Sequence, residues 1–481
     1  RVFNPAMRTP DTTGQRCANR MPAAVLLFFG LAAPAVAAPG SVTFHEQSLW
    51  ALNVGGGPLE TRAGDRFDAD RCDDASRTGR CVQVSPVWRT QAPALYGSFR
   101  IGDQRYLVDL PDGSYDVLLY FTEPPGTAGA SRLLDVFIQD RRLLTNFLLP
   151  ESGDGKPHMA ASRGFTGIEV SDGKLDIRVE GRRGDAVLSG IQVRSSRFAT
   201  DGWELVWSDE FSDAKGLYKQ WTAEQWDPGH VNDEAQAYRR SPDNVRVEDG
   251  VLILEAHYTG KESPAFTSGR VHSWRHRAFR YGRLDIRARV PEGRGVWPAL
   301  WLLPEDPYRY ATNCASSERE WQGNDDCDAW PNSGEIDLME HIGYEPGVVH
   351  GTVHTRDFFA GHGNQVQSSI VVPGLGEAFH TYSLVWEEGA LAMYVDGVRY
   401  YSYFDEGQGS GQWPFDHPFH IVMNLAVGGA WGAALGPVET AAFPRRLEVD
   451  FVRLYERQAA SSSSSGRSPR ERAGRSRGPR Y

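Results

Sequence analysis

The sequence predicts an all-β protein made of two successive β-sandwiches. Residues 115–121 (YDVLLYF) and 391–403 (LAMYVDGVRYYSY) alternate between apolar and polar side chains, the period of a strand with one buried face. Glycine and proline, 51 and 29 of 481 residues, supply many turns. No ten-residue helical pattern lies between the strand patterns, which argues against a parallel α/β sheet. Antiparallel sandwiches fit these observations.

The chain divides into four parts. Residues 40–197 form the first predicted sandwich, and residues 201–457 form the second, in which 280–290 and 381–389 add further strand patterns. Few residues separate the two sandwiches, so close packing is expected rather than a flexible tether. Asp396-Gly397 between two alternating runs predicts a tight hairpin. Residues 458–481 are rich in Ser and Arg and are expected to be disordered.

Residues 1–37 have the pattern of a secretory signal peptide. Arginines precede an apolar run, residues 23–37, which ends in small residues. A short membrane anchor is the alternative, but the run is shorter than the ~20 residues that a bilayer span needs. Residue 1 is Arg, so Met7 and Met21 are candidate start sites. Export is therefore expected, to the exterior or the periplasm.

The cysteines agree with export. Cys17 lies in the predicted signal peptide, and the other four form two local pairs, Cys72 with Cys81 and Cys314 with Cys327. Neither pair is a CxxC and no histidine cluster accompanies them, which argues against a metal site. Two local disulfides are the preferred of the three possible pairings.

Composition limits the partners. The formal net charge of −11 argues against a dedicated nucleic-acid binder, which needs clustered Lys and Arg. The 14 Trp, 18 Tyr and 22 Phe offer flat apolar faces on which sugar rings can stack. A neutral polysaccharide is the expected partner, with no membrane contact after signal cleavage and a monomer as the expected state.

The first sandwich resembles a malectin-type domain. The similarity rests on ALNVGGG, GSYDVLLYFTEP and DAVLSGIQV, at residues 51–57, 113–124 and 185–193. That family is a β-sandwich that commonly binds carbohydrate, so the resemblance implies a lectin-like module. Tyr120 and Phe121 are candidates for sugar contact, and a place in the strand core is the alternative for each.

Three carboxylates concentrate in GEIDLMEH, residues 334–341. Side chains alternate along a strand, so Glu335 and Asp337 share a face, and strict alternation would turn Glu340 away. One extra residue, a β-bulge within Leu338-Met339, would return Glu340 to that face. The sequence therefore predicts three carboxylates along one side of a strand.

This arrangement predicts glycosidase chemistry. With the bulge, the Cα atoms of Glu335 and Glu340 lie about 13 Å apart, at 3.3 Å per residue. Side chains that lean together bring the carboxyl groups to roughly 5–6 Å, the separation of a retaining glycosidase. A solvated strand face and a calcium site are the alternatives.

The second sandwich resembles glycoside hydrolase family 16, whose signature is Glu-x-Asp-x-x-Glu. The resemblance implies a jelly-roll sandwich with a cleft across its concave sheet, Glu335 as nucleophile, Asp337 as the assisting carboxylate and Glu340 as acid/base. Other matching segments follow in the same order: WELVWSDEF, DEAQAY, NVRVEDGVLILEA, FTSGRV, WPALWLLP, HGTVHT, MNLAVGGAWG and VDFVRLYE. They look most like the laminarinase type, endo-acting hydrolases of β-1,3-glucan that need no catalytic cofactor.

Further site residues follow from this resemblance. It implies two groups: the substrate-binding candidates Trp297, Trp301, His354, Arg270, Asn424 and Trp431, and the structural calcium ligands Glu210, Gly250 (backbone) and Asp450. The tryptophans 297 and 301 are four apart and so share a strand face. A core position for one of them, and a purely structural role for the histidine, are the alternatives.

One departure from the family leaves the substrate open. Residues 304–333 form a longer segment than the family usually carries, and it contains the second cysteine pair. Such a loop beside the catalytic strand bears on the substrate and on endo or exo action. Mixed-linkage β-1,3-1,4-glucan, algal galactans and transglycosylation stay open. A non-catalytic glucan-binding protein is the alternative of another class, although such relatives generally lack the paired glutamates.

Overall fold

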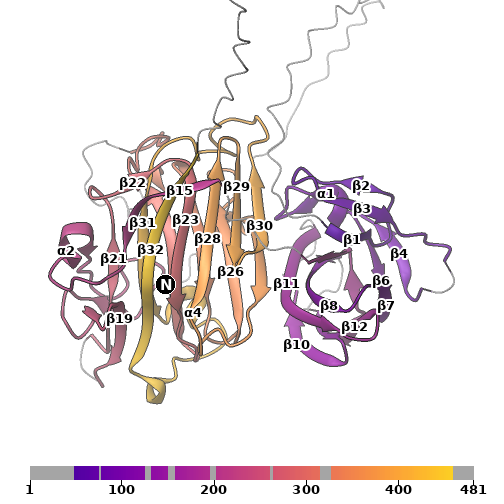
Figure 1. The fold of residues 1–481 in the computed structure, drawn as a ribbon, viewed down its shortest axis with the longest axis horizontal. Helices are drawn as coiled ribbons and strands as arrows, with labels where there is room; N and C mark the ends of the chain where they lie inside the picture. Colours follow the sequence, from indigo (N-terminus) through magenta and orange to yellow (C-terminus); the bar gives the residue numbers. More distant parts are fainter. Residues whose placement is uncertain are drawn as a thin grey trace, which may run out of the picture. The chain divides into compact units, whose positions relative to one another are not determined.

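The computed structural model describes most of the two predicted sandwiches. The described residues are 48–74, 77–124, 132–149, 158–195, 202–260, 264–314 and 327–458. The predicted signal peptide and nearly all of the predicted tail lie outside them. Strands dominate, and every helix in this part of the chain has three or four residues (Figure 1). None of these helices has the length and apolar character of a membrane span.

The first sandwich contains fifteen elements between residues 48 and 194. They are β1 (Ser48–Asn53), β2 (Leu59–Glu60), β3 (Arg66–Ala69), β4 (Arg80–Gln83), β5 (Val87–Trp88), α1 (Pro93–Tyr96), β6 (Ser98–Ile101), β7 (Gln104–Asp109), β8 (Gly113–Glu123), β9 (Leu133–Ile138), β10 (Arg141–Leu148), β11 (His158–Val170), β12 (Lys174–Arg183), β13 (Val187–Leu188) and β14 (Gly190–Arg194).

Two main sheets enclose the core of this sandwich. One has the order β11-β8-β14-β1-β3-β2 and the other the order β10-β9-β12-β7. Alternate residues of β8, such as Val117, Leu119 and Phe121, are fully buried with Val179 of β12 in the same apolar cluster. Phe121 is therefore a core residue, and its assignment as a sugar contact was wrong. Tyr120 lies on the other face of β8 and is half buried, where its hydroxyl donates to Gln192.

The second sandwich contains the remaining elements. They are β15 (Trp203–Asp209), α2 (Leu217–Gln220), β16 (Thr222–Ala223), β17 (Gln236–Tyr238), β18 (Val245–Glu248), β19 (Val251–Tyr258), β20 (Phe266–Ser268), β21 (Arg270–His272), β22 (Ala278–Phe279), β23 (Gly282–Arg289), β24 (Val296–Pro304), α3 (Ala329–Asn332), β25 (Glu335–His341), β26 (Val348–His354), η1 (Ala360–His362), β27 (Val366–Val371), β28 (His380–Glu387), β29 (Ala390–Val395), β30 (Val398–Phe404), β31 (Phe419–Val427), α4 (Gly429–Gly432), η2 (Thr440–Ala442) and β32 (Arg445–Arg457).

One sheet of the second sandwich carries the predicted site. Its order is β21-β31-β24-β25-β26-β27, and we call it the site sheet. The opposite sheet contains β19-β32-β23-β28-β29-β30, of which β23, β28 and β29 run side by side in Figure 1. Apolar side chains such as Leu300, Ile336 and Val353 of the site sheet pack with Leu384 and Trp386 of the opposite sheet. The other face of the site sheet is left for polar and aromatic groups.

The predicted hairpin and both disulfides are confirmed. Val395 pairs with Val398, and Asp396 and Gly397 between them have φ of 50° and 81°. Positive φ at both central residues is the geometry of a type I′ turn, which Asp-Gly favours. Disulfides join Cys72 to Cys81 and Cys314 to Cys327.

Strand pairing also links the two sandwiches. β11 of the first pairs in parallel with β27 of the site sheet, with Gly164 opposite Ile370 and Phe165 opposite Val371. Asp65 beside this junction accepts from Arg194 and from Arg399 of β30, and all three side chains are buried. Close packing of the two predicted units is therefore observed at this junction.

Candidate active site

A β-bulge in β25 places the three carboxylates on one face. Met339 lies opposite Leu300 of β24 and Asp337 lies opposite Trp301, so Leu338 is the extra residue. The register with β26 shifts at the same point, between Asp337 and Glu340. Leu338 and Met339 are fully buried. The bulge predicted from the motif is confirmed.

Each glutamate accepts a hydrogen bond from a different tryptophan. Trp330 Nε1, from α3, donates to Glu335 Oε2 at 3.0 Å, and Trp297 Nε1, from β24, donates to Glu340 Oε1 at 3.0 Å. Asp337 lies between the two glutamates and is 3% exposed. Separate donors therefore hold the two carboxylates apart in an otherwise closely packed site.

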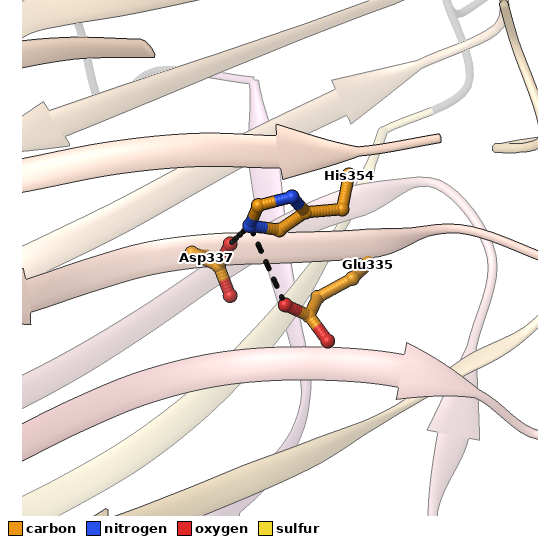
Figure 2. Close-up of side chains that lie close together, drawn as sticks. All are labelled: Glu335, Asp337 and His354. Carbon is orange, nitrogen blue, oxygen red and sulfur yellow. Dashed lines mark ion pairs between the residues drawn. The ribbon is translucent and has the colours of Figure 1, made fainter. Parts of the chain in front are cut away.

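His354 completes the central group (Figure 2). Its Nε2 lies 3.4 Å from Asp337 Oδ2 and 3.7 Å from Glu335 Oε1. Burial lowers the pKa of His354 to about 4, with a smaller effect from the positive charge of Arg89. The imidazole is therefore neutral at neutral pH and contacts the carboxylates without adding a charge.

Burial raises the pKa of all three carboxyl groups. For Glu335 the charge of Glu340 adds to this effect, and for Asp337 the charges of both glutamates do so. A hydrogen bond between Glu335 and Asp337 lowers the pKa of Glu335 and raises that of Asp337, but burial and the charge of Glu340 outweigh it, and the pKa of Glu335 is raised to about 8. Groups this close titrate as a unit, so the three carboxyl groups share protons near neutral pH.

The same central group has the composition of a metal site. Ligand atoms of Glu335, Asp337 and His354 all lie within 4.8 Å of one another. Carboxylate and imidazole are ordinary ligands of divalent ions. Glu335 also accepts from Trp330, whereas Asp337 Oδ2, the oxygen that faces His354, is buried and accepts no hydrogen bond within the described part of the chain.

A second polar cluster extends along the site sheet from Trp301. The indole Nε1 of Trp301 donates to Asn424 Oδ1 at 2.7 Å. The guanidinium of Arg270 lies over the ring of Trp301, at 4.8 Å from its centroid, and over that of Trp226, at 4.3 Å. Asn424 in turn donates to the hydroxyl of Tyr238 at 3.1 Å. The structure thus brings three of the predicted binding residues together.

Trp431 lies at the other side, beside Trp297. Their ring centroids are 5.6 Å apart in an edge-on contact, and the ring of His350 is 5.2 Å from that of Trp431. Five of the six predicted binding residues therefore form two clusters near the carboxylates, and His354 lies among the carboxylates themselves. Trp297 and Trp301 lie on the same face of β24, as predicted. The residues opposite them on the neighbouring strands belong to the sheet face that carries the carboxylates.

Sequence reasoning missed three residues of this site. Trp226 and Trp330 lie outside long strands, where strand alternation gives no guidance. His350 was within reach, because it is four residues from His354 on one strand and so shares its face.

The predicted calcium ligands lie on the opposite sheet, where Asp450 belongs to β32 and Glu210 and Gly250 adjoin β15 and β19. β15 and β19 both pair with β32, which brings Glu210 and Gly250 to the neighbourhood of Asp450. Glu210 accepts from Arg453 at 2.9 and 2.8 Å, and Asp450 pairs with Arg287. Arginines therefore take both carboxylates that a calcium ion would need.

Comparison with known proteins assigns each sandwich to a family. The model of the glycosyl hydrolases family 16 matches residues 232–450, and the model of the malectin domain matches residues 48–192. A β-glucanase of Rhodothermus marinus is 43% identical over 261 residues, which cover 53% of this chain and 85% of that protein. A glucan endo-1,3-β-glucosidase A1 of Niallia circulans is 36% identical over 287 residues, which cover 54% of this chain and 39% of that protein.

A solved structure is similar over the same region. The laminarinase of Rhodothermus marinus has 41% sequence identity and a TM-score of 0.47, and the match covers 53% of this chain and 98% of that one. The first relative is matched over most of its length at high identity, and the family model includes the bulged carboxylate strand. The chain belongs to the glycosyl hydrolases of family 16 and carries a malectin domain before the sandwich that holds the three carboxylates.

Proposed function

We propose that this chain is an endo-acting hydrolase of β-1,3-glucan that retains anomeric configuration through a covalent glycosyl-enzyme. The observation that carries the proposal is the bulge of β25, which directs Glu335 and Glu340 to one face while separate tryptophans hold them. Family membership and the β-glucanase relatives support hydrolysis of β-glucan.

In the first step, the carboxylate of Glu335 attacks the anomeric carbon. The glycosidic bond breaks as Glu340 gives its proton to the leaving oxygen, and a glycosyl ester of Glu335 forms. Protonated Asp337 donates to Glu335 and stabilises its negative charge before attack. Burial raises the pKa of Glu340 to about 7 and that of Glu335 to about 8. The reaction therefore uses the form of this coupled group in which Glu335 has lost its proton and Glu340 keeps its own.

In the second step, water replaces the enzyme at the anomeric carbon. Glu340, now a carboxylate, takes a proton from the water as it attacks, and the bond to Glu335 breaks to release its carboxylate. A sugar hydroxyl can replace water in this step, which would give transglycosylation. The proposed reaction uses side chains of this chain alone and requires no cofactor.

The tryptophans flanking the carboxylates support a sugar polymer as substrate. Trp297 and Trp301 are half-buried on the face of β24 that continues the carboxylate face, and indole rings are suited to contact pyranose rings. Two relatives carry β-glucanase and endo-1,3-β-glucosidase in their names, which favours β-1,3-glucan over mixed-linkage glucan and galactan. The malectin domain is proposed to bind carbohydrate of the same kind.

A non-catalytic glucan-binding protein is the competing function. It would need an aromatic cleft but no paired glutamates with hydrogen-bond donors of their own. The pairing of Trp330 with Glu335 and of Trp297 with Glu340 therefore favours an enzyme.

Release of reducing ends from laminarin tests this function. We expect the wild-type chain to cleave laminarin. Glu335→Ala should lower turnover by about 10⁴-fold or more, because the nucleophile is gone. This variant should still fold and bind glucan. Glu340→Ala is expected to retain activity on aryl glucosides whose leaving groups need no proton. Cleavage of laminarin by either variant at the wild-type rate would contradict the assigned roles.

Export is proposed from residues 1–37, and the two disulfides suit an oxidising compartment. Calcium at Glu210, Gly250 and Asp450 stays a prediction. Because arginines take both carboxylates, the residues as placed do not fit the ion, and the reaction includes no step through it.

A further inference from the structure

Two arginines of the malectin domain reach residues beside the carboxylates of the site sheet. Arg89 follows β5 and Arg163 lies on β11. Their contacts continue through Gln367, His350 and Glu345 of the second sandwich. We call these five residues the arginine–histidine network.

Arg163 forms one end of the network. Its Nη2 lies 3.1 Å from Glu345 Oε2, and its Nη1 donates to Ser369, the residue opposite His350 on β27. The same Glu345 oxygen is 3.1 Å from His350 Nε2. Burial alone would raise the pKa of Glu345, but the hydrogen bond from His350, the charge that this ring carries in acid, and the charge of Arg163 lower it to about 2. Glu345 is therefore a carboxylate with two donors.

Arg89 forms the other end and determines the protonation of His350. A guanidinium can only donate, so the oxygen of Gln367 must be the atom that faces Arg89, at 2.6 Å. The amide NH₂ of Gln367 then faces His350 Nδ1 at 2.8 Å, and this nitrogen must accept. The remaining proton of the neutral ring is on Nε2, where it donates to Glu345.

His350 in turn borders the proposed acid/base. It lies directly opposite Glu340 across β25 and β26, and its side chain is 4% exposed. Its ring contacts Trp431, which contacts Trp297, the residue that donates to Glu340. The orientation of the imidazole therefore affects Trp431 directly. Through Trp431 it affects Trp297, the hydrogen-bond donor to Glu340.

From these contacts we propose that Arg89 and Arg163 are positioning residues of the glucanase site. They hold His350 as the neutral Nε2–H tautomer and fix its ring, and through Trp431 and Trp297 this orientation aims the carboxyl group of Glu340. The malectin domain then contributes to turnover as well as to glucan binding. The inference rests on the proposed function for the role of Glu340 and for the substrate of the kinetic assay.

A matched control lies at the same junction. Arg194 is buried like Arg163 and also spans the two sandwiches, through Asp65 and the carbonyl of Arg399, but it has no contact with the network. Arg163→Gln and Arg194→Gln each remove one buried charge from the junction. A role in docking alone predicts the same kinetic result for both variants.

The first measurement is the kinetics of the full chain on laminarin. We expect Arg163→Gln to lower kcat about tenfold with KM within about twofold, less than the ~10²-fold that a 1 Å misplacement costs. Arg163→Lys should recover most of the loss, because an ammonium group can also donate to Glu345. Arg194→Gln should lower Tm and leave kcat unchanged. Equal losses of kcat in the two glutamine variants, or no loss in Arg163→Gln, would overturn the proposal.

The second measurement is independent of turnover. The ¹⁵N shifts of the His350 ring, assigned by comparison with His350→Gln, report its tautomer. We expect Nε2–H in the wild type and a mixture of tautomers in Gln367→Leu, which removes the donor to Nδ1. An Nδ1–H ring or a charged ring in the wild type near pH 7 would overturn the inference. If the wild type did not cleave laminarin, the proposed substrate would fail while this test of the network still stood.

Discussion

Trp297 and Trp330 give the two glutamates of the site different surroundings. Each indole donates one hydrogen bond to one carboxylate, yet Trp297 lies on a strand of the site sheet and Trp330 on a four-residue helix. An indole N–H can only donate, so it stabilises the ionised form of its partner and lowers its pKa against the effect of burial. Each glutamate therefore has its own hydrogen-bond donor, although the two carboxyl groups titrate together.

Replacing Trp297 with Phe tests this at the acid/base. Burial raises the pKa of Glu340 to about 7 and the hydrogen bond from Trp297 lowers it, so loss of the donor should raise it further. A general acid works only while protonated, so the alkaline limb of kcat/KM should move to higher pH by about one unit, the scale of one charged hydrogen bond. Trp301→Phe is the control, because its indole donates to Asn424. A shift to lower pH in Trp297→Phe, or equal shifts in both, would contradict this account.

At this scale the sequence motif identified the carboxylates but not their donors. Glu335, Asp337 and Glu340 could be predicted because the spacing of a strand assigns faces to them. Trp330 could not, since it lies on the four-residue α3, where strand alternation assigns no face. The separation of the two carboxyl groups stays a prediction.

Among the elements, the bulge of β25 decides which face Glu340 occupies. Leu338 is the single residue without a partner on β24, and Glu340 returns to the face of Asp337 because of it. This could be predicted since alternation leaves only one way to bring three carboxylates together. The segment between β24 and β25 could not be predicted in the same way, because no periodic pattern runs through it and α3 has four residues.

Two changes in β25 test the bulge. Deletion of Leu338 leaves Glu340 two residues after Asp337, so a regular strand keeps both carboxylates on one face. The exchange Met339→Glu with Glu340→Met keeps the strand length, so the bulge should turn the moved glutamate toward the core, where Met339 lies. We expect the deletion to keep measurable cleavage of laminarin and the exchange to lose it, with far-UV circular dichroism to check folding. Higher activity in the exchange variant would show that the bulge does not set the face.

For the whole molecule, the junction of the two sandwiches is the feature that the sequence did not reveal in detail. A short linker predicted close packing, but the pairing of β11 with β27 and the buried Asp65 join residues more than 200 positions apart. Such long-range contacts have no local pattern. Burial raises the pKa of Asp65, yet the charges of Arg194 and Arg399 more than offset this, and the net pKa is below its ordinary value.

Asp65→Asn should loosen this junction. A lowered folded pKa means that Asp65 stabilises the protein fully above its unfolded pKa of about 4 and that this stability is lost as pH falls through the folded value. At neutral pH the substitution removes the carboxylate that two buried arginines share and should cost about 3–5 kcal/mol. Urea unfolding at pH 7 and pH 3 should show a smaller difference between variant and wild type at pH 3. Glu60→Gln, in an exposed pair with Arg66, is the control and should change neither curve.

The pairing of β11 with β27 has a consequence for any attempt to produce the family 16 sandwich alone. Without the malectin domain, β27 would become an open edge of the site sheet, with free N–H and C=O groups next to Ile370 and Val371. Bare edges of this kind recruit strands from neighbouring molecules. The family 16 sandwich without the malectin domain would therefore tend to self-associate, and in the full chain the malectin domain covers this edge and so opposes aggregation.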